Sequence, residues 1–209
     1  MTQYIIDALG VSRAQADALR TGYTIRYGAT LLGLTRHHPV DPHDFLKVVH
    51  TFDDLPSMLV AERGLAHSIA ALPGRKIVLT NGPEAYAQAV LRELGIERLF
   101  ERVVAIEHMR AGPVWRAKPD RAMLRETLRR AGVPLADAIL IEDTRGHLKR
   151  YKRLGIRTVW ITGFLPARTV LMPAGRGGRP HYVDQRVRSL KSLQMRLRSG
   201  QLKRLGRTG

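Results

Sequence analysis

Four short apolar runs, separated by segments of helical periodicity, constrain the fold of this 209-residue chain more than any other feature. We expect each run to form a β-strand and each intervening segment, which ends at a glycine or proline, to form a helix. Such a series of strand–helix units is typical of an α/β fold with an open parallel sheet and helices on both faces. The expected strands span residues 76–80, 103–106, 138–141 and 158–161. The first run is continuously apolar, which predicts burial on both faces.

The first part of the chain has a different pattern, which predicts helices without strands. From Met1 to about Leu34 apolar residues recur at spacings of three to five, and interrupting glycines favour two helices with a bend. Ser12 is the expected N-cap. Two prolines predict a loop over residues 37–42, and a short helix follows at 45–49. The expected organisation is a helical domain (1–57), an α/β domain (58–165) and a basic extension (166–209).

Two polar residues after the first strand and before a later helix have the chemistry of a phosphate site. Thr80 ends its strand and is followed by Asn81 and by a helix start at Pro83. A hydroxyl together with the N–H groups of a helix start can bind a phosphate. Lys118 precedes Pro119, a good first helical residue, so its ammonium can lie near the same sheet edge. Taken alone, the first is also explained as an ordinary strand end with an N-cap and the second as a surface lysine.

Two adjacent carboxylates, Glu142 and Asp143, follow the third expected strand. Neighbouring carboxylates repel each other and lose solvation at the end of a buried strand, so a cation or N–H groups usually stabilise them. Oxygen ligands of this kind suit Mg²⁺. The alternative is that Asp143 is the N-cap of the next helix, expected over residues 148–154.

The order and the residue types of these motifs resemble those of the haloacid dehalogenase (HAD) superfamily. Its second, third and fourth motifs are similar to Leu79-Thr80-Asn81, Lys118-Pro119 and Glu142-Asp143-Thr144. The closer resemblance is to its pyrimidine 5′-nucleotidase-like branch, supported by residues 26–34, 94–100 and 154–156, and it covers about residues 1–165. The resemblance implies a HAD-like Rossmannoid core with residues 1–57 as a helical cap that closes over the substrate.

The same resemblance implies an activity and a role for each site residue. The activity is Mg²⁺-dependent hydrolysis of a phosphomonoester, a nucleoside 5′-monophosphate or a similar small phosphate, through an aspartyl-phosphate. Thr80 and the Asn81 backbone N–H would bind the phosphoryl group, and Lys118 would stabilise charge on the nucleophile and the phosphoryl oxygens. Glu142 and Asp143 would bind Mg²⁺ directly or through water.

The family's first motif, Asp-x-Asp-x-Thr, does not occur before Thr80. Its first Asp is the covalent nucleophile and its second the general acid/base. Asp7 and Asp17 lie in helical patterns, and Asp53-Asp54 follows no apolar strand. We therefore expect the first core strand to be absent and two neighbouring strand edges to be left unpaired. We also expect this chain not to catalyse the hydrolysis. Either the start codon is misplaced or the gene is truncated, and the intact remaining motifs favour a misplaced start.

Charge is distributed unevenly along the chain, whose formal net charge is +17. Residues 1–143 carry 18 basic and 17 acidic side chains, whereas residues 144–209 carry 17 basic side chains and one acid, Asp184. A neutral body with a basic appendage indicates an ordinary domain and not a dedicated nucleic-acid-binding protein. Residues 185–209 have the spacing of a basic amphipathic helix that could lie on RNA, an acidic membrane or the protein's own core, although a solvated tail is the interpretation we prefer.

The remaining composition predicts a cytoplasmic protein that acts on a small phosphorylated substrate. No apolar stretch approaches the roughly 20 residues that span a bilayer, and the N-terminus shows no signal peptide. Cysteine is absent, which excludes disulfides and thiolate metal sites. His37, His38 and His43 lack the spacing of a metal-binding helix, and a polar loop explains them better.

Overall fold

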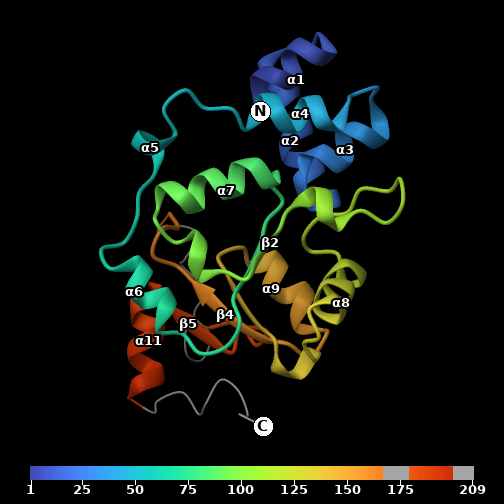
Figure 1. Ribbon diagram of the computed structural model, residues 1–209. Coiled ribbons are helices and arrows are strands. Elements are labelled where there is room, and N and C mark those ends of the chain that lie inside the picture. The colour runs from blue at the N-terminus through green and yellow to red at the C-terminus, as the bar shows by residue number, and fades with distance from the viewer. Residues whose placement is uncertain (167–178, 200–209) are drawn as a thin grey trace. The chain divides into compact units, whose positions relative to one another are not determined.

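The computed structural model describes residues 1–166 and 179–199, which are coloured along the chain in Figure 1. The chain divides into two compact units. Unit 1 contains residues 1–59 and 76–123, and unit 2 contains residues 60–75 and 124–209. The expected helical segment therefore shares a unit with the first expected strand, so the units do not follow the domain boundaries expected from the sequence.

Unit 1 begins with five helices, and three of them occupy the segment in which two were expected. Gly10 and Gly28 end the first two helices with φ angles of 64° and 90°, a backbone conformation that favours glycine. The expected N-cap at Ser12 is confirmed, because its hydroxyl accepts a hydrogen bond from the Gln15 N–H and the Gln15 side-chain oxygen accepts one from the Ser12 N–H. The helices are α1 (Thr2–Leu9), α2 (Arg13–Tyr27), α3 (Thr30–His37), α4 (Pro42–Val49) and α5 (Leu55–Met58).

The helical part of unit 1 has its own apolar core. Ile5 of α1, Leu34 of α3 and Phe45 of α4 are almost completely buried and belong to one cluster. Ile106 and Ala117, which lie outside the helices, belong to the same cluster. This packing joins the helices to the segment that leads to Lys118, because burying apolar surface is the main stabilising term in such contacts.

The sheet of unit 1 consists of two parallel strands, β1 (Ile77–Leu79) and β2 (Arg102–Val104), connected by α7 (Glu84–Glu93) and a short 3₁₀ helix (Glu97–Leu99). The second strand ends earlier than expected, because Ala105 donates its N–H to the His108 ring at the start of a 3₁₀ helix (Ile106–Met109). The predicted full burial of β1 is wrong, since its three residues are half-buried. Within unit 1, β2 is the one strand that pairs with β1 among the described residues.

Unit 2 contains a three-stranded parallel sheet in the order β3-β4-β5. The expected α/β pattern of parallel strands alternating with helices is confirmed, but the described strands form two sheets. β3 is an edge strand of its sheet, and so is β1 in unit 1. The elements of unit 2 are α6 (Leu65–Ala70), most of α8 (Arg121–Arg130), a 3₁₀ helix (Leu135–Asp137), β3 (Ile139–Glu142), α9 (Arg145–Lys152), β4 (Arg157–Ile161), β5 (Gln185–Val187) and α11 (Leu190–Arg198).

Strand β4 carries the core of unit 2 on both of its faces, because successive side chains of a strand point to opposite sides. Trp160 packs with Leu148 of α9 on one face. Val159 packs with Leu193 of α11 on the other, where Leu72 after α6 joins the same cluster. Figure 1 shows α6 beside α11. Helices therefore cover both faces of this sheet, as the sequence pattern predicted.

Part of the expected basic tail is folded into unit 2. β5 pairs in parallel with β4, with Trp160 opposite Arg186, and Ser189 caps α11 by accepting the Ser192 N–H. Leu193 is 1% exposed. The expectation of a solvated tail is wrong for residues 179–199, because the amphipathic helix buries its apolar side on the protein's own core. The basic residues Lys203, Arg204 and Arg207 lie outside the described residues.

Candidate active site

The segment after β1 places Thr80 at the carboxyl end of its strand, as expected. Its N–H donates to the Val104 carbonyl at 3.0 Å, which continues the ladder with β2. Its hydroxyl oxygen, Oγ1, accepts the Gly82 N–H at 3.0 Å and so stabilises the turn into α7. In parallel α/β sheets this edge is where ligands bind. Thr80 is half-buried, which keeps part of the residue accessible.

The start of α7 differs from the helix N-terminus that the sequence predicted. Glu107 accepts the Glu84 N–H with both carboxylate oxygens at 3.2 Å. This carboxylate at the positive end of a helix occupies the first helical N–H that we expected to bind phosphate. The phosphate-binding capacity of this loop therefore rests on the groups between Thr80 and Gly82.

Asn81 joins the Thr80 loop to the Lys118 loop with its side chain. Its Oδ1 accepts the Lys118 N–H at 2.7 Å, and its Nδ2 donates to the Lys118 carbonyl at 3.2 Å. Nδ2 also lies 3.3 Å from the Gly28 carbonyl, to which it donates. The peptide bond between Lys118 and Pro119 is cis. These bonds hold two segments, 37 residues apart in sequence, in one fixed relationship.

Gly28 at the end of α2 lies against the same lysine. A Cβ atom at this position would collide with the Lys118 carbonyl oxygen and lie 2.8 Å from Cδ of Pro119. The φ of Gly28 is 90°, which side-chain-bearing residues rarely adopt. The end of α2 thus packs against the Lys118 loop at Gly28, a position that only glycine can occupy without strain.

His50 is a residue of this region that sequence reasoning missed. Its ring Nδ1 lies 2.9 Å from the Leu46 carbonyl, and its ring lies 5.3 Å from that of Tyr86. A Cβ atom on Gly82 would lie 3.7 Å from His50 Nε2, so the imidazole borders the turn after Thr80. Burial lowers the pKa of His50 and favours the neutral ring. The residue directly follows the short helix expected over residues 45–49, where the sequence gives no chemical signal.

In unit 2, Glu142 ends β3 with its carboxylate turned toward the start of α9. The residue is 8% exposed, and its Oε1 lies 3.2 Å from the Asp143 N–H and 3.0 Å from the Thr144 N–H, both of which donate to it. Its other oxygen, Oε2, lies 3.3 Å from Nδ1 of His147. The carboxylate therefore satisfies N–H groups ahead of the helix, a role the sequence analysis had assigned to Asp143 as the alternative to metal binding.

Asp143 is exposed and its backbone is fixed. The Trp160 indole N–H donates to the Asp143 carbonyl at 3.0 Å. The Thr144 hydroxyl donates to its Oδ1 at 3.0 Å. Thr144 is the residue that precedes α9, and it makes no side-chain capping bond. Of the two expected metal ligands, Asp143 is thus the one whose carboxylate lies at the surface.

The fit of these residues to a magnesium ion can be judged from their oxygen atoms. Within residues 1–166 and 179–199, no group of three or more His, Asp or Glu side chains could hold a metal. Mg²⁺ commonly uses one or two protein carboxylates and completes its octahedron with water and substrate phosphate. Asp143 fits the role of a carboxylate ligand of Mg²⁺. Glu142 instead shapes the turn beside it.

The structure brings some of the expected site residues together within each unit. In unit 1, Asn81 follows Thr80 directly and binds the Lys118 peptide with its side chain, and in unit 2 Glu142 and Asp143 lie at one strand end. Sequence reasoning assigned only the backbone N–H of Asn81 and missed its side-chain bonds. An asparagine directly after a strand, followed by glycine, was the available signal.

Within the part of the chain that the structure describes, no helix combines the length and the apolar character needed to cross a bilayer.

Comparison with known proteins gives a family match and curated relatives that bear on this site. Residues 61–149 match the family described as haloacid dehalogenase-like hydrolase. A probable phosphoglycolate phosphatase from Pseudomonas savastanoi is 29% identical over 82 residues. That match covers 39% of this chain and 48% of the relative, so the chain spans about half the length of the curated relative it matches.

Solved structures resemble the whole chain at low identity. CbbY from Rhodobacter sphaeroides, in complex with phosphate, is 22% identical with a TM-score of 0.60, and the match covers 92% of this chain and 86% of that one. A HAD phosphatase from Thermococcus onnurineus is 18% identical with a TM-score of 0.58, covering 94% and 86%. The L-2-haloacid dehalogenase of Xanthobacter autotrophicus is 17% identical with a TM-score of 0.57, covering 88% and 82%. At these identities the likeness concerns the fold.

Proposed function

We propose that this chain is a haloacid dehalogenase-like hydrolase, the family whose model matches residues 61–149, and that Thr80, Asn81 and Lys118 bind the phosphoryl group of a small phosphomonoester. The observation that carries the proposal is the pair of hydrogen bonds between Asn81 and the Lys118 peptide. A hydroxyl and a lysine held in one fixed relationship can meet the oxygens of a phosphate without further ordering.

Each residue has a distinct task in this proposal. Thr80 Oγ1 donates its own proton to a phosphoryl oxygen, because its lone pair already accepts the Gly82 N–H. Lys118 supplies positive charge where negative charge develops as the phosphorus–oxygen bond to the leaving group breaks. His50 borders the loop as a neutral ring and limits water there.

Hydrolysis also needs groups that the described site residues do not supply. In the proposed route a carboxylate oxygen attacks phosphorus and the alcohol oxygen leaves with a proton, after which water cleaves the acyl phosphate. Such a nucleophile would have to follow a strand near Thr80. Asp143, beside Glu142 in unit 2, is the carboxylate we propose to hold Mg²⁺, an ion that neutralises negative charge in phosphoryl transfer.

For the substrate we propose a nucleoside 5′-monophosphate. This choice rests on the resemblance of residues 26–34, 94–100 and 154–156 to the pyrimidine nucleotidase-like branch. The curated relative carries the name of a phosphoglycolate phosphatase, which makes 2-phosphoglycolate the natural comparison compound. We expect the enzyme to act in the cytoplasm, since the chain has no cysteine to be oxidised elsewhere.

The experiment is phosphate release from uridine and cytidine 5′-monophosphates and from 2-phosphoglycolate, with Mg²⁺ or with EDTA, using protein that begins at the preceding start codon. Lys118→Ala should lower the rate about 100-fold or more, as the loss of one preorganised charge typically does. The exposed Lys191→Ala on α11 removes the same charge elsewhere and should leave the rate unchanged. Equal rates for the two variants would refute the assignment of Lys118.

A further inference from the structure

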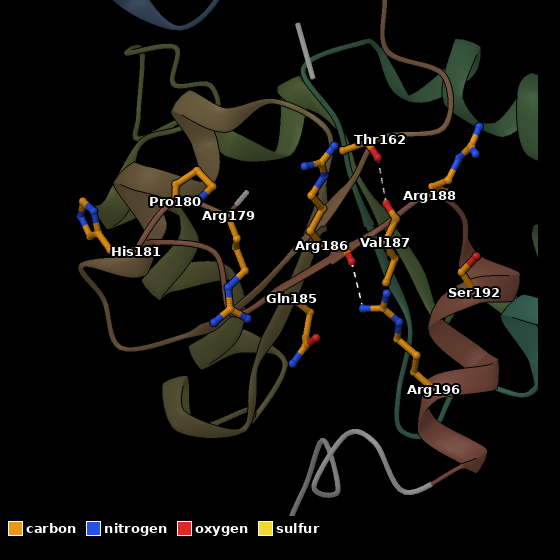
Figure 2. A pocket seen from close by; sticks show the side chains of 10 residues that line it. All are labelled: Thr162, Arg179, Pro180, His181, Gln185, Arg186, Val187, Arg188, Ser192 and Arg196. Carbon is orange, nitrogen blue, oxygen red and sulfur yellow. Dashed lines mark hydrogen bonds between the residues drawn. The ribbon is translucent and has the colours of Figure 1, made fainter. Parts of the chain in front are cut away.

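Unit 2 contains a cavity of about 720 Å³ beside the edge strand β5. It lies outside residues 61–149, the segment shared with the hydrolase family. The residues come from the end of β4, the segment before β5, β5 itself and α11, and Figure 2 labels them all. They are Thr162, Arg179, Pro180, His181, Gln185, Arg186, Val187, Arg188, Ser192 and Arg196.

The cavity is strongly basic. Four of its ten lining residues are arginines, a fifth is histidine, and no aspartate or glutamate lines it within the described residues. The one acidic residue after position 143 is Asp184, next to the cavity. Its carboxylate oxygens both lie 2.6 Å from the Lys152 ammonium, and Oδ2 also accepts the Thr158 N–H at 2.8 Å. Asp184 is engaged with these groups, so the arginines give the cavity a positive potential that favours an anionic ligand.

Three of the arginines are oriented by contacts with β4, with β5 or with the residue before β5. The Arg179 guanidinium donates to the Asp184 carbonyl through Nη1. The Arg196 Nη1 donates to the Arg186 carbonyl at 3.1 Å, and Figure 2 shows this bond reaching from α11 to β5. The Arg186 guanidinium lies over the Trp160 ring, 5.2 Å from its centroid. A guanidinium has five N–H donors, so one bond to a carbonyl orients Arg179 and Arg196 and leaves further N–H groups of these two residues to meet a ligand.

The floor of the cavity is rigid. Thr162 donates both its N–H and its hydroxyl to the Val187 carbonyl, at 3.0 and 3.2 Å. A Cβ atom on Gly163 would collide with the Arg188 carbonyl oxygen, so the two strand ends approach as closely as glycine permits. Ser192 stands in the first turn of α11, where its N–H is capped by Ser189. The basic side chains are therefore arranged before any ligand arrives.

We propose that this cavity is a binding site for a small anion with several phosphate groups, separate from the phosphomonoester that is hydrolysed. Arginines in this number match a chain of phosphates, because each planar fork can bind two oxygens. The volume is that of a small-molecule site, which is roughly 300–1,000 Å³. No phenylalanine, tyrosine or tryptophan lines it among the described residues. Stacking of bases, which single-stranded nucleic acid uses, is therefore not provided.

The test is binding of inorganic tripolyphosphate to the full chain by isothermal titration calorimetry, with orthophosphate and a single-stranded oligonucleotide as comparison ligands. Arg196→Gln and, separately, Arg179→Gln should each weaken tripolyphosphate binding about tenfold or more, the usual effect of losing a charge-assisted bidentate contact. Arg198→Gln is the matched control, because it removes an exposed arginine from the same helix without touching the cavity.

The outcomes separate the alternatives. Tripolyphosphate bound at least tenfold more tightly than orthophosphate, and weakened by the Arg196 and Arg179 variants but not by Arg198→Gln, supports the site. Equal weakening by all three variants would show a general charge effect and overturn it. Tighter binding of the oligonucleotide than of tripolyphosphate, sensitive to the same residues, would make this a nucleic-acid surface and also overturn it. Circular dichroism of each variant checks that it folds. Arg196 and Arg179 lie on different segments, so if one of these two variants misfolds, the other still tests the site.

Discussion

The side-chain amide of Asn81 forms two hydrogen bonds with the peptide groups of Lys118, one with its N–H at 2.7 Å and one with its carbonyl at 3.2 Å. The Asn81 amide thereby pairs with both the backbone N–H and the backbone carbonyl of Lys118, as a neighbouring strand would in a sheet. A phosphate-binding lysine gains from this, because its own backbone position does not have to be ordered when the substrate arrives.

The first prediction concerns the contribution of this amide to stability. Asn81→Ala should lower the free energy of unfolding by about 2 kcal/mol, because it leaves two half-buried backbone groups of Lys118 without their partners. Urea denaturation followed by circular dichroism measures the change. Gln88→Ala, which removes an i,i+4 side-chain bond to Glu84 on α7, is the control and should cost less than about 0.5 kcal/mol. Similar losses in both variants would contradict the bridging role.

The second prediction separates backbone strain from collision at two glycines. Gly10 and Gly28 both have positive φ, but only Gly28 has neighbouring atoms that a Cβ would meet. Gly10→Ala should destabilise the protein by about 1 kcal/mol through strain alone. Gly28→Ala should cost about 2 kcal/mol more, because the Lys118 carbonyl has to move as well. Equal midpoints in thermal unfolding would show that the Lys118 loop does not depend on Gly28.

Much of the fold could be predicted because its signals are local. The apolar runs before Thr80 and Glu142 predicted strands within one or two residues of those observed, and the N-cap expected at Ser12 is the one observed. The burial of β1 was overestimated, because a continuous apolar run does not reveal how many neighbours a strand has. The split of the strands into two sheets depends on pairing between distant segments, which periodicity does not encode.

The residues of the candidate site were predicted, but the hydrogen bonds between them were not. Thr80 and Lys118 were identified from residue type and position, whereas the side-chain bonds of Asn81 require two loops to meet in space. The inward turn of Glu142 also escaped prediction, since either of two adjacent carboxylates can satisfy the N–H groups ahead of α9. The basic tail was misjudged because the net charge of a segment says little about the few apolar residues, such as Leu193, that anchor it.

A third prediction assigns different roles to the two adjacent carboxylates. Glu142→Gln should lower the free energy of unfolding by about 1–2 kcal/mol, because the buried carboxylate accepts two N–H groups and the weaker neutral amide replaces it. Asp143→Asn alters an exposed side chain and should change stability by less than about 0.5 kcal/mol. Asp143→Asn should instead weaken the stabilisation of the protein by Mg²⁺ in thermal unfolding. A larger stability loss from Asp143→Asn than from Glu142→Gln would reverse the assignment.

The fourth prediction concerns the pH dependence of unit 2. Burial acts to raise the pKa of Asp184, but hydrogen bonds from the Lys152 ammonium and the Thr158 N–H outweigh it and hold the pKa below 3.8. A carboxyl whose pKa falls on folding stabilises the protein above its unfolded pKa and loses that contribution as the pH falls through its folded pKa. The stability difference between the wild type and Asp184→Asn should therefore shrink between about pH 6 and about pH 3 in urea titrations. A constant difference would contradict this coupling.

The most direct test of the phosphatase proposal compares two forms of the protein, this 209-residue chain and one extended upstream to the preceding start codon, in Mg²⁺-dependent phosphate release from nucleoside 5′-monophosphates. If the extended form supplies an apolar strand ending in Asp-x-Asp, we predict that it hydrolyses the substrate and that EDTA and Lys118→Ala abolish nearly all of this activity. We predict that the short form binds phosphate without hydrolysing the substrate. Hydrolysis by the short form at the rate of the extended one, or activity that survives both EDTA and Lys118→Ala, would contradict the account.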